Sequence, residues 1–231
     1  MSYVFTPAAT VSVPVLGTSA RFPVHRIYCV GRNYEDHAKE MGFSGREPPF
    51  FFMKPADALV VVNAGETGAM PYPSLTKNLH HEIELVVAIG KGGKDIKAAD
   101  AQSHIFGYAV GLDMTRRDLQ NEMKKQGRPW CIGKGFDKAA PIGPITPVAA
   151  ARDINNAEIY LQVNGQERQH SNVSKLIWNI AETIEHLSAA WELQPGDLIY
   201  TGTPEGVAAV VAGDTMHGGV SGLEPITVSV K

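Results

Sequence analysis

Short apolar runs and alternating apolar and polar positions dominate the chain, a pattern typical of β-strands. Residues 159–163 followed by Asn164-Gly165 predict a β-hairpin, because this dipeptide favours the tight turn between antiparallel strands. Residues 1–25 alternate only loosely and predict an edge strand or two, interrupted by Pro14 and Pro23. The remaining strands are expected at 27–30, 50–54, 81–89, 105–112, 198–200 and 226–230, and the first two of these are predicted to be buried.

Helical spacing is confined to a few segments. Residues 173–193 carry the one long amphipathic pattern, and residues 115–126 predict a second helix that begins at Thr115 and ends at Gly127. A short helix is expected over residues 34–41. The chain has no internal repeat or linker, so the prediction is one domain over 1–231, mostly strands with two or three helices.

Composition places the 231-residue chain among globular proteins, with 44% apolar and 19% charged residues. No run approaches the ~20 apolar residues that cross a bilayer, and the first residues do not resemble a signal peptide. A net charge of −3 without a basic stripe argues against nucleic acid as a partner. Cys29 and Cys131 lack disulfide or CxxC spacing, which favours a reducing, cytoplasmic compartment.

The most informative stretch is the predicted strand that carries Glu82 and Glu84. Alternate side chains of a strand share a face, so both carboxylates project together, and Asp113 ends another apolar strand. Buried carboxylates repel each other unless a cation neutralises them, and three of them suit Mg²⁺, Mn²⁺ or Ca²⁺. The alternatives are a solvated edge-strand face and, with His80 or His81 as a ligand, a zinc site.

A second pair of candidates lies on the short predicted helix. His37 and Glu40 are i and i+3, so they share one helix face. A carboxylate beside an imidazole raises its basicity, which suits a general base acting on water. A surface His–Glu pair explains the same spacing.

Two glycine-containing segments can approach an anionic substrate. Lys134 stands between Gly133 and Gly135 without the spacing of a nucleotide-binding loop, and residues 201–206 form a small-residue loop after a strand. A lysine ammonium, or hydroxyls and backbone amides, can bind a carboxylate. Simple turns account for both segments equally well.

Seven motifs, taken in order along residues 26–207, resemble the fumarylacetoacetate hydrolase family, in its short acylpyruvate and fumarylpyruvate hydrolase branch. Each motif is short, but their joint order is specific. They are Cys29-Val30-Gly31-Arg32-Asn33-Tyr34, Phe52-Met53-Lys54-Pro55, His81-Glu82-Ile83-Glu84-Leu85, Gly111-Leu112-Asp113-Met114-Thr115, Arg117-Asp118-Leu119-Gln120, Lys134-Gly135-Phe136-Asp137 and Pro195-Gly196-Asp197-Leu198-Ile199-Tyr200-Thr201-Gly202-Thr203-Pro204.

The resemblance implies an α+β fold, a strand-rich mixed β-roll with a few helices, in a homodimer. It also implies one Mg²⁺ or Mn²⁺ per subunit, held by Glu82, Glu84 and Asp113. His37 and Glu40 become the water-activating pair.

By the same resemblance, Lys134 and Gln120 surround the oxo-acid end of the substrate, and Thr203 contacts its carboxylate. Arg117 braces Asp113 or the substrate. Arg32 is one of several cations near the motifs that can pair with a second carboxylate, together with Lys54, Arg46, Arg116 and Arg128.

The expected activity is hydrolysis of a carbon–carbon bond in a 2,4-dioxo acid, with fumarylpyruvate giving fumarate and pyruvate as in aromatic degradation through gentisate. Such a reaction needs a Lewis acid, a base for water and a donor for the oxyanion, and the chain offers a candidate for each. The alternatives are a general acylpyruvate hydrolase, an oxaloacetate decarboxylase and a non-catalytic dimeric binding protein.

Overall fold

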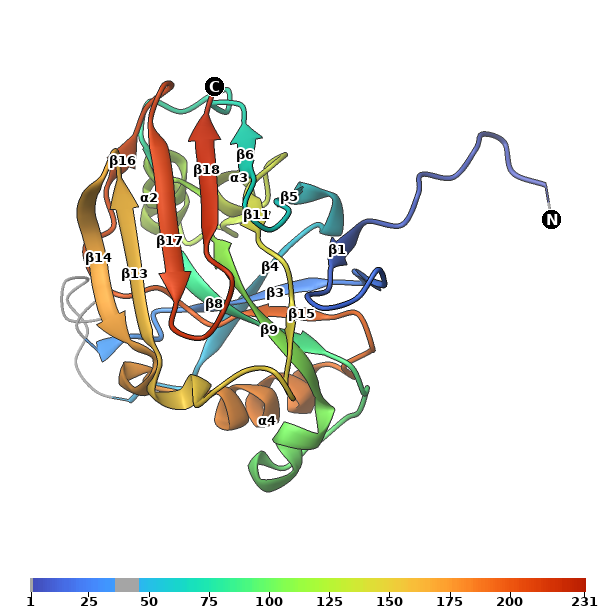
Figure 1. Ribbon diagram of the computed structural model, residues 1–231. Helices are drawn as coiled ribbons and strands as arrows, with labels where there is room; N and C mark the ends of the chain where they lie inside the picture. The colour runs from blue at the N-terminus through green and yellow to red at the C-terminus, as the bar shows by residue number, and fades with distance from the viewer. Residues whose placement is uncertain (1, 36–45) are drawn as a thin grey trace.

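The computed structural model describes residues 2–35 and 46–231, whose strands form two main sheets. In Figure 1 the five-stranded sheet lies in front of the larger sheet and crosses it. The segment before β1 extends away from the body of the molecule, and the chain ends with β18.

The larger sheet has the strand order β4-β3-β15-β8-β9-β11-β5, with β12 paired to β9. Its central strand β8 lies antiparallel to both β15 and β9. The strands are β3 (Ile27–Gly31), β4 (Phe50–Lys54), β5 (Leu59–Val61), β8 (Ile83–Ile89), β9 (Ile105–Leu112), β11 (Ala140–Ile142), β12 (Thr146–Pro147) and β15 (Leu198–Tyr200).

The five-stranded sheet has the order β14-β13-β17-β18-β6, so β14 forms one edge. Its strands are β6 (Thr67–Met70), β13 (Glu158–Val163), β14 (Gln166–Asn172), β17 (Thr215–Val220) and β18 (Ile226–Val230). The smaller sheets contain β1 (Ser12–Pro14) with β2 (Arg21–Pro23), and β7 (Leu79–His80) between β10 (Thr115–Arg116) and β16 (Ala209–Val210).

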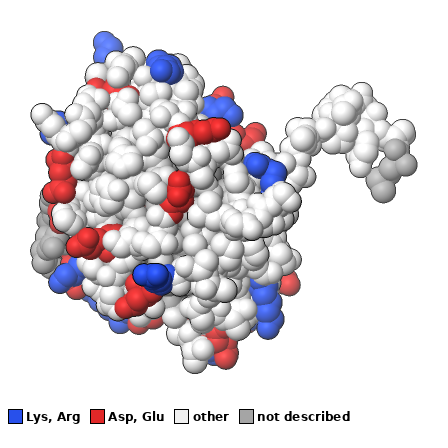
Figure 2. All heavy atoms as spheres, in the orientation of Figure 1, with Lys and Arg blue, Asp and Glu red and all other residues white. Residues whose placement is uncertain are grey.

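Helices in the described part of the chain are short. They are α2 (Arg117–Lys125), α3 (Cys131–Lys134) and α4 (Ile180–Ala190), with 3-10 turns η1 (Ala56–Ala58), η2 (Ala98–His104), η3 (Ile154–Asn156) and η4 (Val173–Lys175). No helix among these residues is long and apolar enough to cross a bilayer. On the face drawn in Figure 2, basic side chains are scattered among acidic ones, without a continuous basic stripe.

Apolar side chains bury both faces of β8. Ile83 and Leu85 belong to the larger core cluster, which also contains Leu161 of the five-stranded sheet, whereas Val86 and Ala88 pack into a second cluster on the other face. Every residue of β8 is buried. The strand that carries Glu84 therefore crosses the centre of the molecule.

Four sequence predictions about secondary structure need correction. The strand predicted over 81–89 begins at Ile83, so Glu82 lies just before it. The long helix predicted over 173–193 is a 3-10 turn followed by α4, because Asn179 caps the helix and forms a capping box with Glu182. The helix predicted from Thr115 begins at Arg117, because Thr115 pairs with β7. The strand 50–54 is an edge strand with exposed Phe50 and Met53, not a buried one.

Other predictions are confirmed. Asn164 and Gly165 both have positive φ angles (52° and 78°) and join β13 to β14 in the predicted hairpin. The strands at 105–112 and 226–230 match β9 and β18. The short helix predicted over 34–41 falls almost entirely outside the described residues.

Candidate active site

Three buried carboxylates meet where β8 and β9 come together. Ile83 pairs with Leu112 in the antiparallel ladder, and the Asp113 N–H donates to the Glu82 carbonyl at 2.8 Å. Carboxylate oxygens of Glu82, Glu84 and Asp113 all lie within 4.8 Å of one another. The three residues are 5%, 2% and 1% exposed, so the solvated-face interpretation of this strand is wrong.

The charges of this cluster are largely balanced by buried cations. The Lys134 ammonium lies 2.7 Å from both Glu82 Oε2 and Asp113 Oδ2. Burial opposes the charged form of Lys134, but Asp113 and Glu82 outweigh it and raise its pKa. Lys134 therefore stays protonated, at the end of the short helix α3 rather than in a turn.

Glu84 makes no ion pair with a described residue. Its Oε2 accepts the Gly202 N–H at 2.9 Å. Burial, followed by the charges of Asp113 and Glu82, raises the pKa of Glu84 well above its usual value. Because a cation shared by the three carboxylates would relieve this repulsion, the donor set fits a hard divalent metal with oxygen ligands.

Lys54, named from the sequence only as one of several cations that can pair with a second substrate carboxylate, is a second buried cation at this site. It ends β4, is 1% exposed, and its Nζ lies 2.8 Å from Asp113 Oδ1. The same ammonium donates to the carbonyls of Met114 (3.0 Å) and Lys134. Lys54 thus fixes one metal-ligand candidate and the backbone of α3 relative to each other.

Arg117 contacts Glu82 rather than Asp113. Its Nη2 pairs with Glu82 Oε1, and its Nη1 donates to Gln120 Oε1 at 2.6 Å. Gln120 is 3% exposed and lies one helical turn further along α2. His80 approaches Arg117 Nε at 3.4 Å, and burial together with the Arg117 charge lowers the His80 pKa to about 4.

Neither histidine of the His80-His81 pair joins the carboxylate cluster found among the described residues. His81 Nδ1 instead lies 3.0 Å from Gln169 Oε1, on β14. The donor set is therefore carboxylate oxygen alone, which does not favour zinc.

The loop after β15 connects the carboxylates to the pocket wall. The Thr201 carbonyl accepts from Asn33 Nδ2 at 2.8 Å, and the Gly202 N–H donates to Glu84 Oε2. The next residue, Thr203, is 4% exposed. Gly202 has a φ of +104°, and a Cβ there would come within 2.8 Å of the Asn33 side chain. Glycine is therefore required for this close approach.

One pocket contains the carboxylates and most of the predicted site residues. It is lined by Val30, Gly31, Arg32, Phe52, Glu82, Glu84, Asp113, Arg117, Gln120, Trp130, Lys134 and Thr203. His37 and Glu40 lie outside the described residues, so their roles stay predictions.

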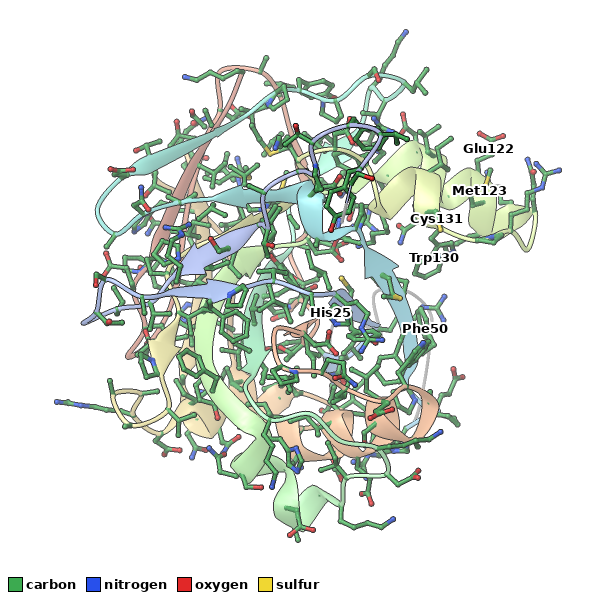
Figure 3. The ribbon with its side chains drawn as sticks, turned by 90° about the vertical axis from the view of Figure 1, so that its right-hand side faces the viewer. His25, Phe50, Glu122, Met123, Trp130 and Cys131 are labelled. Atoms are coloured by element: carbon green, nitrogen blue, oxygen red, sulfur yellow. The ribbon has the colours of Figure 1, made fainter. Side chains whose placement is uncertain are left out.

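Arg32 and the aromatic side chains of Phe52 and Trp130 line the same pocket as the carboxylates. Arg32 has a φ of +56°, a conformation that costs energy for any residue with a Cβ, and its guanidinium lies 5.4 Å from the Phe50 ring centroid. Phe50 meets Trp130 edge to face, with centroids 5.3 Å apart (Figure 3). Sequence reasoning missed Trp130, although a tryptophan beside the Lys134 motif was a readable signal.

The other candidate cations lie elsewhere. Arg46 is exposed, pairs with Glu182 at 2.6 Å and covers the Trp178 ring. Arg116 stacks over Phe136, and Arg128 is exposed. Among these arginines, Arg32 alone lines the pocket.

Comparison with known proteins agrees with this geometry. The family model described as fumarylacetoacetate (FAA) hydrolase C-terminal matches residues 26–231. A Ralstonia protein named fumarylpyruvate hydrolase is 49% identical over 185 residues, covering 80% of this chain and 93% of that protein. A mitochondrial oxaloacetate decarboxylase of Dictyostelium discoideum is 39% identical, covering 86% of this chain and 90% of that protein.

Among solved structures, fumarylpyruvate hydrolase from Pseudomonas aeruginosa, in complex with Mn²⁺ and pyruvate, superimposes with a TM-score of 0.97 at 56% identity. The match covers 99% of each chain. The strand-rich fold expected from the sequence is thereby confirmed, and the chain belongs to the fumarylacetoacetate hydrolase family.

Proposed function

We propose that this protein is a metal-dependent hydrolase of 2,4-dioxo acids that converts fumarylpyruvate into fumarate and pyruvate. The observation that carries the proposal is the cluster of Glu82, Glu84 and Asp113, whose buried side chains line a pocket that also contains cationic side chains. The Ralstonia and Pseudomonas proteins named for this reaction support the choice of substrate.

Glu82, Glu84 and Asp113 would hold Mg²⁺ or Mn²⁺, one ion in each subunit. Bound there, the ion supplies Lewis acidity toward the oxygens of the oxo-acid end. The Mn²⁺ in the Pseudomonas structure supports this assignment. Arg117 keeps Glu82 in place through its ion pair, and Gln120 in turn orients Arg117.

In the proposed reaction the oxygen of water bonds to the acyl carbonyl carbon. The bond from that carbon to the methylene carbon breaks, and its electron pair stays on the pyruvyl fragment, which then takes up a proton. His37, backed by Glu40, would accept the proton from water. Lys134 would donate to the oxyanion formed on attack, and Thr203 to the substrate carboxylate.

Arg32 is the proposed reader of the distal carboxylate, because it lines the pocket and burial lowers its pKa, a sign of partial desolvation. We expect Arg32→Gln to lower kcat/KM for fumarylpyruvate about 10²-fold and to change that for acetylpyruvate little, since only fumarylpyruvate has a second carboxylate. Glutamine has a Cβ as arginine does, so the substitution leaves the backbone energy at the positive φ of residue 32 unchanged.

Steady-state kinetics on both substrates test Arg32, with the exposed Arg128→Gln as the matched control. An equal decrease in kcat/KM for the two substrates would show that Arg32 supports the pocket generally and does not bind the distal carboxylate.

Lys134→Met should separate metal binding from turnover. We expect kcat to fall about 10²- to 10³-fold through loss of an oxyanion donor. Affinity for Mn²⁺ should not fall, because the ammonium now contacting Glu82 and Asp113 competes for the same oxygens. Calorimetric titration with Mn²⁺ and single-turnover hydrolysis measure the two effects. A variant that loses metal affinity and activity together contradicts this role.

Oxaloacetate decarboxylation is the second candidate activity. The Dictyostelium relative named for it is 39% identical, and the same carboxylates and cations would bind its oxo-acid end. Assays of purified protein against fumarylpyruvate, acetylpyruvate and oxaloacetate, with and without EDTA, decide between the candidates. EDTA-insensitive activity would overturn the metal dependence, whereas no activity on any of the three would overturn the proposed function and favour a binding protein.

We also propose a single catalytic domain that works as a homodimer in the cytoplasm. Exposed apolar side chains on neighbouring elements, Phe50 and Met53 of β4 and Ile132 of α3, support a face covered by a second copy. Light scattering of the purified protein measures the mass directly.

A further inference from the structure

Gln169 is an unusual residue on the edge strand β14. It is 1% exposed, whereas every other residue of that strand is half-buried or exposed. Nothing in the polar sequence around it predicts burial. Because a buried amide is costly unless its hydrogen bonds are satisfied, its partners identify what it does.

The Gln169 amide has four partners that fix its orientation. Its Oε1 accepts the Ile83 N–H at 3.1 Å, and His81 Nδ1 lies 3.0 Å from the same oxygen. Its Nε2 lies 2.9 Å from the Pro204 carbonyl and 2.8 Å from Thr203 Oγ1. A peptide N–H can only donate and a carbonyl can only accept, so the amide cannot be turned around.

This orientation determines the role of the Thr203 hydroxyl. Because Gln169 Nε2 donates to Thr203 Oγ1, the hydroxyl proton cannot point toward Gln169. Thr203 lines the pocket that contains the three carboxylates. Its O–H is therefore left to donate to a ligand in that pocket.

The loop that carries Thr203 also rests on the β14 backbone next to Gln169. Gly206 has a φ of +88°, and a Cβ there would meet the Arg168 carbonyl at 2.1 Å. Only glycine permits so close an approach. Backbone contact and side-chain hydrogen bonds thus both join this loop to β14.

We propose that Gln169 is a positioning residue for substrate binding, which holds the Thr203 hydroxyl so that its proton faces the substrate carboxylate. This inference rests on the proposed function, in which Thr203 contacts that carboxylate. Gln169 itself is separated from the pocket by Thr203 and acts through it.

Pyruvate titrated into the Mn²⁺-loaded protein, followed by calorimetry, tests the inference. We expect Gln169→Met and Thr203→Val each to weaken pyruvate binding about 10- to 100-fold, the usual worth of a hydrogen bond to a charged group. Mn²⁺ affinity should stay at the wild-type value. Gln166→Met, on the exposed part of the same strand, is the control and should bind pyruvate normally.

The double variant carries the decisive result. If Gln169 acts through Thr203, Gln169→Met should add less than about twofold in a Thr203→Val background. The inference is overturned if the losses of pyruvate affinity multiply in the double variant, or if Gln169→Met alone binds pyruvate as tightly as the wild type. Should Gln169→Met fail to fold, Gln169→Glu keeps the side-chain shape. Its carboxylate accepts the Thr203 proton, and the same weakening is expected.

The outcome separates this inference from the proposed function. Coupled losses of pyruvate affinity in a protein that hydrolyses no acylpyruvate support the Gln169 role and reject the activity. Hydrolysis of fumarylpyruvate, together with losses of pyruvate affinity that multiply in the double variant, supports the activity and rejects the Gln169 role. Wild-type protein that binds no pyruvate overturns the inference, and the hydrolysis assay then decides the proposed function separately.

Discussion

Glu82→Gln should abolish divalent-metal binding and reduce hydrolysis by more than about 10³-fold, because Lewis-acid stabilisation is worth several kcal/mol. The substitution keeps the shape of the side chain but removes the charge that faces Arg117 and Lys134. Since breaking a buried ion pair leaves its partner uncompensated, we also expect the metal-free protein to lose about 3 kcal/mol of unfolding free energy.

Mn²⁺ titration, turnover of fumarylpyruvate and urea unfolding measure these effects on one preparation. Glu158→Gln is the matched control, since Glu158 is exposed at the start of β13. Wild-type metal affinity and turnover in Glu82→Gln would remove Glu82 from the site and with it the carboxylate assignment.

The carboxylate cluster shows how far the sequence can predict a site. Period-two alternation places Glu82 and Glu84 on one side of the chain, and the end of an apolar run marks Asp113. The pairing of β8 with β9 brings Asp113 beside Glu82, and no local pattern specifies which strands become neighbours. The residues of the site can therefore be identified from the sequence, whereas the pairing of the strands determines the distances between them.

The position of Lys54 beside Asp113 and the burial of Gln169 could not be predicted, because both depend on distant segments. A lysine after Phe-Phe-Phe-Met and a glutamine between Arg168 and His170 look like surface residues. Each is buried by partners more than 30 positions away in the sequence, Asp113 for Lys54 and Thr203 for Gln169. Tertiary packing, rather than propensity, decides such positions.

The helix boundaries were predicted wrongly for a different reason. The Asn179 to Glu182 spacing is a capping box, so the start of α4 was readable in the sequence. The apolar positions at 176 and 177 continue the helical spacing upstream and concealed it. The apolar run at 50–54 was equally ambiguous, because an edge strand and a central strand share this pattern.

His37→Ala should lower the rate of hydrolysis about 10²- to 10⁴-fold, the usual contribution of general base catalysis. Oxaloacetate decarboxylation, where the wild type performs it, should be spared, because that reaction needs no activated water. His37 follows Arg32, a pocket residue, by a few positions. Asn33, which follows Arg32, is held in place by Trp178, whose backbone N–H donates to Asn33 Oδ1 at 2.8 Å.

Rates of both reactions, measured on one preparation of His37→Ala, give the test, with the half-exposed His170→Ala as control. Both substrates share the oxo-acid end, so a residue that only binds this end must affect both reactions equally. Selective loss of hydrolysis thus identifies His37 with water activation, and Glu40→Gln should then give a smaller selective loss, since it weakens the imidazole as a base without removing it. Equal losses would assign His37 to binding and require a different base.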